Sequence, residues 1–294
     1  LQDNRFVPTL LNYTEQQKKL VEILEESVKK RLIADVPLGA FLSGGIDSSV
    51  VVALASRHTD KLNTFSIGYK DEPFFDETYY ADLVAKKFGT HHTVFSLTND
   101  DLFEHLFDTL NYIDEPFADS SALAVNILSY HTRKHVKVAL SGDGADELFA
   151  GYDKYLGEYK ARNGGFGATV LKYLHPLWEA LPKSRNSYFE NKIRQFHRFS
   201  QGMKLSEVER YWLWCGFVNE NEALKLITPL IEADNGGGSS PFRGLGGKKA
   251  ENDKIDLSEY QQRKDSITQK ITGNNDINEV LYCDMNLALQ NDML

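Results

Sequence analysis

The sequence contains two Ser-Gly turns, each of which directly follows a short run of apolar residues. The first run, at 36–42, leads into Ser43-Gly44-Gly45, and the second, at 136–140, leads into Ser141-Gly142. A short apolar run that ends at glycine is typical of a buried strand entering a tight turn. The two segments therefore predict two buried strands, each with a glycine turn at its carboxyl end.

Helical patterns alternate with strand patterns throughout the first half of the chain. Thr14 and Gln17 form a capping box that predicts the start of a helix near 15–33. Further strands are predicted at 62–69 and 92–97, and further helices at 48–57, from Asp76 to Gly89, at 102–110 and from Ser120 onward. Such alternation predicts βαβ units and a parallel sheet, in which a ligand binds beyond the carboxyl ends of the strands.

Two of these helices carry apolar residues that predict how they are buried. The helix at 48–57 is apolar almost all round, which predicts a buried helix. The helix at 102–110 is predicted to have one apolar face, formed by Leu102, Phe103, Leu106, Phe107 and Leu110.

The strand signal fades after about residue 150. The sequence predicts an α/β core over 1–155 and a mainly helical extension over 156–294. Within the extension, the glycine-rich stretch near 234–253 cannot bury apolar area, so we expect a mobile loop or linker there.

Composition excludes several function classes. Lys+Arg 33 against Asp+Glu 42 gives a net charge of −9, which argues against a general nucleic-acid binder. The two cysteines, Cys215 and Cys283, are too few for a disulfide framework or a four-cysteine zinc site, so we expect free thiols in the reducing cytoplasm. There is no run of 18 apolar residues and no signal peptide, so neither a membrane span nor secretion is expected.

The first turn has the residues needed to hold a phosphate or pyrophosphate group. Gly44 and Gly45 allow the backbone to approach a ligand closely, and the following helix directs its free N–H groups at the turn. The turn has no lysine, which excludes a Walker A loop. The carboxylate of Asp47 beside a polyphosphate calls for a bridging Mg²⁺. The alternative is an ordinary glycine turn with a helix cap.

Both turns resemble motifs of known enzymes. Ser43-Gly44-Gly45-Ile46-Asp47-Ser48 resembles the pyrophosphate loop of the ATP pyrophosphatases. The stretch at 138–152, Val-Ala-Leu-Ser-Gly-Asp-Gly-Ala-Asp-Glu-Leu-Phe-Ala-Gly-Tyr, resembles that of glutamine-dependent asparagine synthetases and of β-lactam-forming relatives. Asp114-Glu115-Pro116-Phe117-Ala118-Asp119-Ser120-Ser121 is also similar to that family. The resemblance implies a twisted parallel sheet of the adenine nucleotide alpha hydrolase type with helices on both faces, followed by a mostly helical part.

The resemblance also implies roles for individual residues. Asp143 would be catalytic, standing where the family has an acidic residue tied to the acyl-adenylate. Asp47 and Asp146 would hold Mg²⁺. The pyrophosphate would be held by Ser43, Gly44, Gly45, Asp47 and Ser48, the adenosine part by Leu42 and Ile67, and the nucleotide also by Ser141 and Gly142.

The function implied is that of an amide-forming ligase in asparagine biosynthesis. ATP would adenylate aspartate, and ammonia, released from glutamine by a glutaminase domain of the full-length protein, would give asparagine, AMP and pyrophosphate. A β-lactam synthetase-like or other carboxylate-adenylating amidotransferase, or a non-catalytic nucleotide-binding module, remains the alternative. The oligomeric state is open, with a homodimer as one candidate.

Two departures from the family pattern concern the ends of the chain. No cysteine precedes Cys215, so the N-terminal glutaminase domain, whose nucleophile is a cysteine, is expected to be absent. The catalytic lysine that follows the family's Asn-Asp-x-Leu stretch is also expected to be missing, because the sequence stops at Asn291-Asp292-Met293-Leu294. We therefore expect this fragment alone to be incomplete or inactive as an enzyme.

Overall fold

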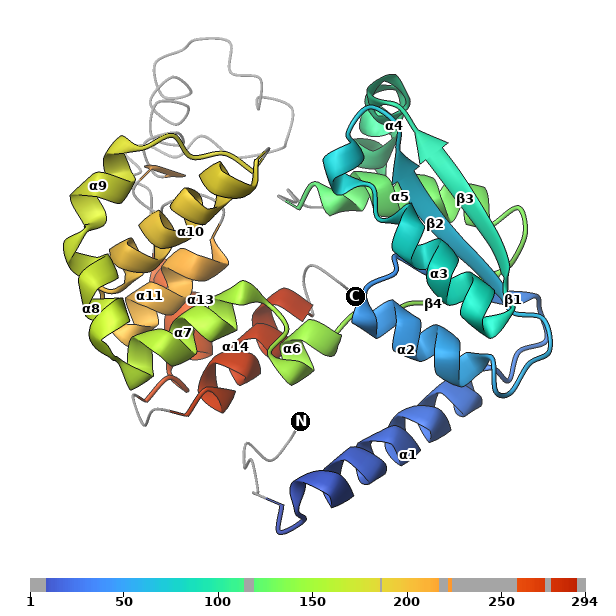
Figure 1. Cartoon of the computed structure of the whole chain (residues 1–294), viewed down its shortest axis with the longest axis horizontal. Coiled ribbons are helices and arrows are strands. Elements are labelled where there is room, and N and C mark those ends of the chain that lie inside the picture. The colour runs from blue at the N-terminus through green and yellow to red at the C-terminus, as the bar shows by residue number, and fades with distance from the viewer. Residues whose placement is uncertain are drawn as a thin grey trace. The chain divides into compact units, whose positions relative to one another are not determined.

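The computed structural model describes residues 9–113, 119–185, 187–216, 222–223, 258–272 and 276–289. The chain divides into two compact units, Leu1–Asp146 and Glu147–Asp292 (Figure 1). This division falls earlier than residue 155, where the sequence suggests a boundary. Among the described residues, no helix is both long and apolar enough to cross a membrane.

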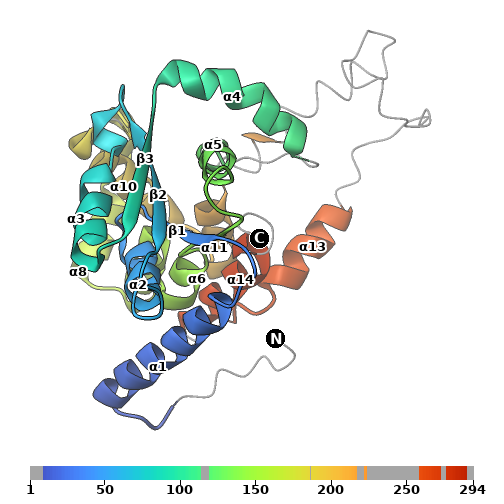
Figure 2. The ribbon, with the colours of Figure 1, turned by 90° about the vertical axis from the view of Figure 1, so that its right-hand side faces the viewer.

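Unit 1 is built on a four-stranded sheet in which every strand pair is parallel. The strands are β1 (Leu38–Phe41), β2 (Asn63–Tyr69), β3 (His91–Leu97) and β4 (Val138–Leu140). Their order is β3-β2-β1-β4, so β1 lies in the middle of the sheet with β2 and β4 on either side. Figure 2 shows β3, β2 and β1 next to one another in this order. The predicted α/β fold with a parallel sheet is confirmed.

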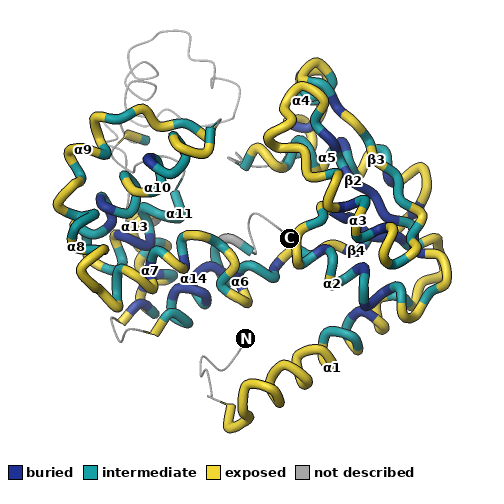
Figure 3. Tube along the Cα trace, in the orientation of Figure 1, coloured by how far each residue is buried: buried dark blue, intermediate teal, exposed yellow. Residues whose placement is uncertain are grey.

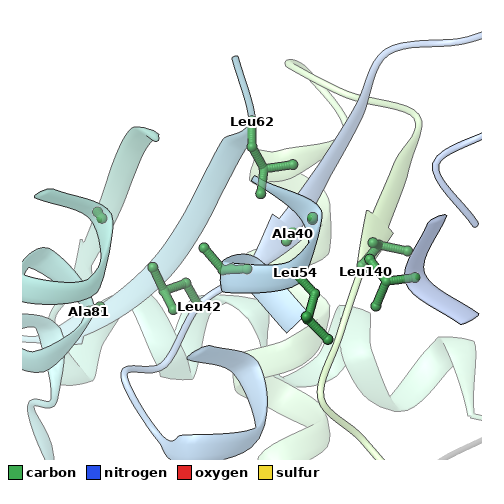
Figure 4. Packing of buried hydrophobic residues seen from close by; sticks show 10 residues of the cluster. Ala40, Leu42, Leu54, Leu62, Ala81 and Leu140 are labelled. Atoms are coloured by element: carbon green, nitrogen blue, oxygen red, sulfur yellow. The ribbon is translucent and has the colours of Figure 1, made fainter. Parts of the chain in front are cut away.

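One face of the sheet is covered by α2 (Ile46–Ala55) and α3 (Thr78–Phe88), and α1 (Tyr13–Arg31) packs on α2. The core lies between these helices and the strands, and Figure 4 shows its side chains converging from β1, β4, α2 and α3. The fully buried members include Ala40, Leu42, Val52, Ala55 and Ala81. Small residues on the helices let them approach the sheet closely, so the turns between strands and helices are held in place.

The opposite face is covered by α5 (Ser121–Thr132), with α4 (Asn99–Tyr112) packed on α5 and β3. Phe65 of β2 and Phe95 of β3 stack with their ring centroids 6.2 Å apart, and the ring of His131 from α5 stacks on Phe95 at 4.9 Å. Because neighbouring strand residues point to opposite faces, Thr64 and Ser66 lie on the side away from these rings. Helices therefore cover both faces, as expected.

Several local predictions differ from the structure. The capping box of α1 is formed by Asn12 and Glu15 instead of Thr14 and Gln17, because Asn12 Oδ1 accepts from the Glu15 N–H and the Glu15 carboxylate accepts from the Asn12 N–H. The helix expected at 48–57 begins at Ile46, and Ile46 and Val50 are exposed, so α2 is buried on one side only. α3 ends at Gly89 as predicted, in the left-handed conformation that glycine adopts without strain.

The helix expected to bury an apolar face at 102–110 also differs. α4 exposes Phe103, Phe107 and Leu110, which is visible as a largely exposed helix in Figure 3. α4 packs on α5 and on β3, which is an edge strand of the sheet. The apolar face of α4 is wider than this contact, so part of its side chains stay in solvent.

Unit 2 is helical throughout the residues that the structure describes. Its elements are α6 (Ala145–Phe149), α7 (Asp153–Asn163), α8 (Phe166–Tyr173), α9 (His175–Ala180), α10 (Tyr188–Gly202), α11 (Glu207–Cys215), α13 (Ser258–Thr268) and α14 (Asn278–Ala288). Its core cluster comprises Tyr155, Tyr211, Ile271, Val280, Leu281 and Cys283. The predicted helical character of the second half is confirmed, and the stretch at 234–253 lies outside the described residues.

The interior of unit 2 also contains ionised groups. Arg210 makes two hydrogen bonds to the buried carboxylate of Glu158, at 2.7 and 2.8 Å, and Arg162 donates a third at 2.7 Å. The buried carboxylate of Asp284 accepts hydrogen bonds from the Tyr155 hydroxyl at 2.5 Å and the Tyr211 hydroxyl at 2.9 Å. These contacts join α7 and α11 to each other and both to α14.

Candidate active site

The first turn of unit 1 follows the end of the central strand β1. Gly44 has φ +89°, and a β-carbon there would lie 2.6 Å from the main-chain nitrogen of Ala81 and from the Tyr80 Cβ. Only glycine combines this positive φ with the lack of a β-carbon, because any other residue would be strained and would collide with α3. The packing of α3 against the turn therefore determines its path.

Serine hydroxyls hold the turn in a single arrangement. The Oγ atoms of Ser43 and Ser48 lie 3.1 Å apart, the Gly45 N–H donates to Ser43 Oγ at 3.2 Å, and the Ser43 N–H donates to Ser48 Oγ at 3.3 Å. Gly45 is the N-cap of α2 and makes no side-chain cap. The first N–H groups of α2, which have no helical acceptors, are therefore presented at a preformed turn with the positive end of the helix dipole.

The second turn joins the first directly. A β-carbon on Gly142 would lie 2.7 Å from the Ser48 nitrogen and 2.9 Å from both the carbonyl carbon and the Cβ of Asp47. Gly144 has φ +88°, and α6 begins at Ala145. The structure thus brings together the two turns predicted from the sequence, as expected from the pairing of β1 with β4.

The acidic residues predicted for catalysis and metal binding lie on these two turns. Asp143 is exposed, Asp47 is half-buried in the first turn of α2, and Asp146 is half-buried in α6. Ser141 is exposed at the end of β4. A carboxylate on an exposed turn between two glycines is available to a ligand.

The two residues predicted to contact adenosine, Leu42 and Ile67, lie after β1 and within β2. Leu42 is 1% exposed, and Figure 4 shows its side chain within the core, so only its main chain remains for a nucleotide. Its carbonyl oxygen also accepts a hydrogen bond from the Ser66 hydroxyl. Ile67 is half-buried and opposite Phe95, and β2 continues beyond it to Tyr69, so Ile67 does not lie at the end of its strand.

One further polar residue received no role from the sequence. Glu147 is 1% exposed; its Oε1 accepts a hydrogen bond from the Tyr152 hydroxyl at 2.9 Å, and its Oε2 has no partner among the described residues. Its position within the second motif could have singled it out from the sequence. However, a Glu in the first turn of a helix is commonly a solvated residue. Of the Asp114–Ser121 stretch, residues 114–118 lie outside the described structure.

Comparison with known proteins relates the chain to one enzyme family. The asparagine synthase family model matches residues 19–294. A putative glutamine-hydrolysing asparagine synthetase from Methanocaldococcus jannaschii is 40% identical over 65% of this chain, and an asparagine synthetase from Bacillus subtilis is 37% identical over 48%. Among solved structures, an NH3-dependent NAD synthetase from Campylobacter jejuni matches 82% of this chain and 100% of its own, with 15% identity and a TM-score of 0.31.

The matched regions cover 36% of the length of the archaeal relative and 23% of that of the Bacillus protein. The family model, by contrast, extends over most of this chain and includes both Ser-Gly turns. The chain therefore belongs to the asparagine synthase family.

Proposed function

We propose that this chain is an ATP-dependent amide-forming ligase domain that adenylates aspartate and transfers ammonia to it. The aspartate side-chain carboxylate attacks the α-phosphorus of ATP, and pyrophosphate leaves. Ammonia then attacks the acyl carbon, and AMP leaves as asparagine forms. The observation that carries this proposal is the direct contact of Gly142 with Asp47 and Ser48, which joins two glycine turns at the carboxyl ends of adjacent parallel strands.

The first turn is suited to the pyrophosphate leaving group. Its main-chain N–H groups and the N-terminus of α2 place positive electrostatic potential where negative charge accumulates as the bond to the α-phosphorus breaks. Ser43 and Ser48 hold this turn through their mutual hydrogen bonds, so little reorganisation is needed when the charge develops. Ser43, Gly44, Gly45, Asp47 and Ser48 form the proposed pyrophosphate site.

Magnesium fits this donor set. Mg²⁺ is usually bound by one or two carboxylates together with substrate phosphates. Asp47 and Asp146 would provide two carboxylates, and the described residues contain no cluster of three or more metal-binding side chains that would suit an all-protein site. When bound, the ion would neutralise the charge of the polyphosphate.

Asp143 is the proposed catalytic residue. It is exposed on the second turn, next to Gly142, whose backbone touches the first turn. There its carboxylate would orient ammonia or accept a proton from it as the amide bond forms, a role of general acid–base type. Ser141 and Gly142 would contact the nucleotide, and Leu42 and Ile67 would flank the adenosine part, Leu42 through its main chain.

The proposal extends to partners. Ammonia would come from glutamine through a glutaminase domain of the same protein, and the setting would be cytoplasmic. A homodimer is a candidate assembly. Glutamine as the source of ammonia is supported by the names of the relatives, which describe glutamine-hydrolysing enzymes.

The decisive experiment is ATP–pyrophosphate exchange by the full-length protein in the presence of a panel of carboxylic acids. We expect exchange with aspartate and little with glutamate or with β-amino acids. Exchange driven by another acid would favour a β-lactam synthetase-like or other amidotransferase. ATP binding without exchange for any acid would favour a nucleotide-binding module and would contradict the proposal.

A further inference from the structure

A second candidate site lies wholly within unit 2. Side chains from α7, α8, α10 and α11 enclose a pocket of about 340 Å³ (Figure 1 shows these helices). This volume is in the range of small-molecule sites in proteins. The pocket is separate from the turns of unit 1, so whether it binds a ligand is independent of the proposed function.

The pocket is strongly basic, although the whole chain carries a net charge of −9. Five cationic side chains line it: Lys154, Lys160, Lys192, Arg194 and Arg198. Lys154 is paired with Asp284 at 2.7 Å. Among the described residues, none of the other four forms an ion pair.

One carboxylate, that of Asp153, also lines the pocket. Its Oδ2 accepts a hydrogen bond from Gln195 at 2.9 Å, and it attracts Arg194 only from a distance. A single carboxylate cannot balance four unpaired cations. The pocket therefore retains a positive electrostatic potential. Its apolar walls strengthen this potential because they screen the charges less than water does.

The two arginines are held in place by their neighbours. Arg198 donates hydrogen bonds to the carbonyl oxygens of Leu213 at 3.0 Å and Gly216 at 3.1 Å, near the end of α11. Arg194 donates to Asn191 Oδ1 at 2.9 and 3.1 Å. Both guanidinium groups are thus fixed before any ligand binds, which lowers the entropy cost of binding.

The arginines also repel each other. The pKa of Arg194 lies below its ordinary value because burial desolvates the guanidinium and because Arg185 and Arg198 repel its charge. The pKa of Arg198 is lowered in the same way by burial and by Arg185. Bringing these charges together is unfavourable in the free protein, and an anion in the pocket would relieve the repulsion.

We propose that this pocket binds a small phosphorylated ligand. A phosphate group offers several acceptor oxygens, which match the planar donor set of arginine and the ammonium groups of lysine. Trp214 provides an aromatic wall beside the cations, and its ring is held by stacking on Phe199 with the centroids 6.1 Å apart. The organic part of a phosphate ester would pack on this wall.

Trp214 provides a local probe for the test. The chain has 3 tryptophans, and of these Trp214 lines the pocket while Trp178 and Trp212 do not. The Trp214 indole N–H donates to the carbonyl oxygen of Arg198 at 3.1 Å. In an NMR titration, the Trp214 indole resonance, assigned with Trp214→Phe, would be followed as inorganic phosphate or phenyl phosphate is added at constant ionic strength. We expect a saturable shift with both, and tighter binding of phenyl phosphate; phenol alone should give none.

Variants separate the pocket from other anion sites. The double variant Lys192→Gln/Arg194→Gln is expected to weaken phosphate binding at least about 10-fold. Lys204→Gln, an exposed cation of the same unit outside the pocket, should change it less than about twofold. Asp47→Asn, in the proposed pyrophosphate site, should leave this shift unchanged.

Three results would overturn the proposal. The first is a Trp214 shift that grows with ligand concentration without saturating. The second is a phosphate affinity of the double variant equal to that of the parent protein. The third is a shift that disappears in Asp47→Asn. If the double variant does not fold, Lys160→Gln takes its place, because Lys160 is exposed and its replacement is compatible with the fold. An affinity unchanged by Lys160→Gln would equally contradict the proposal.

Discussion

Gly142 lies against the main chain of Ser48, so closely that a β-carbon at position 142 would be 2.7 Å from the Ser48 nitrogen. Ser48 is in the first turn of α2, and Gly142 follows the neighbouring strand β4. This contact makes one site from two turns that are far apart in the sequence. The site is therefore sensitive to the addition of a single methyl group at position 142.

We expect Gly142→Ala to separate the two turns. The added methyl group has no room, and overpacking of this kind costs about 1–3 kcal/mol of unfolding free energy. ATP affinity should fall together with stability, as measured by calorimetry and by urea unfolding. Gly167→Ala is the matched control, since nothing lies within 4 Å of a β-carbon there. Unchanged stability of the Gly142 variant would show that the turns are not in contact.

Asp47→Asn should weaken binding of Mg-ATP much more than binding of AMP. The carboxylate is proposed to act through the cation on the pyrophosphate end, which AMP lacks. Titration calorimetry with each ligand, with and without Mg²⁺, measures both affinities. Equal losses for Mg-ATP and AMP would contradict the placement of Asp47 at the pyrophosphate.

In the full-length protein, Asp143→Asn is expected to slow amide formation at least about 100-fold with ammonia as the nitrogen donor. Because Asp143 is exposed on its turn, the melting temperature and ATP affinity should stay close to those of the parent protein. A rate that falls only in proportion to lost folded protein would assign Asp143 a purely structural role.

Glu158→Gln should destabilise unit 2 by about 3–5 kcal/mol at neutral pH, because two buried arginines would lose their shared carboxylate. The exposed pair of Lys86 and Asp82 is the control, since removal of the Lys86 charge should cost less than about 1 kcal/mol. Urea unfolding of both variants measures the difference.

This destabilisation should depend on pH with a defined sign. Burial alone would raise the pKa of Glu158, but hydrogen bonds from Arg210 and Arg162 outweigh it and lower the pKa below the ordinary 4.5. The stabilisation is therefore complete above the pKa of the unfolded chain and is lost as the pH falls through the folded one. The difference between parent and variant should shrink below about pH 4.5. A difference that stays constant down to pH 2 would contradict the pairing.

Both cysteines should react slowly with alkylating reagents while the protein is folded. Burial and the nearby charge of Asp284 raise the pKa of Cys215 to about 12, and burial and Asp284 likewise raise that of Cys283 to about 12. Since the thiolate is the nucleophile, iodoacetamide labelling at pH 8 should be at least about 100-fold slower than for a free thiol. Mass spectrometry follows the labelling, and in urea both residues should react at the ordinary rate. Fast labelling of either residue in the folded protein would contradict the raised pKa of its thiol.

Local sequence patterns predicted the elements well where one apolar pattern dominates. The runs at 62–69 and 92–97 correspond to β2 and β3 almost residue for residue. Patterns that compete within a few residues were less informative. Two capping boxes, Thr14 with Gln17 and Asn12 with Glu15, are offset by two residues. Local sequence does not decide between them, because each has the residue types that would cap a helix beginning at its own position.

By itself, the sequence determined the alternation of strands and helices, the two Ser-Gly turns and the family of the chain. The periodicity of apolar residues and the conformational freedom of glycine are local properties, so they can be read without the fold. This is why Ser43, Gly44, Asp47 and Gly142 could be nominated before their positions were known.

Only the tertiary structure decided which of these residues meet. The strand order β3-β2-β1-β4 pairs β4 with β1, and this pairing brings Gly142 to Ser48. It likewise placed the Leu42 side chain in the core, which leaves its main chain for the proposed nucleotide contact. In unit 2, Lys154, Lys192 and Arg198 line one pocket because α7 and α10 pack together with α11. Contacts between distant segments depend on the packing of whole elements, which no local pattern records.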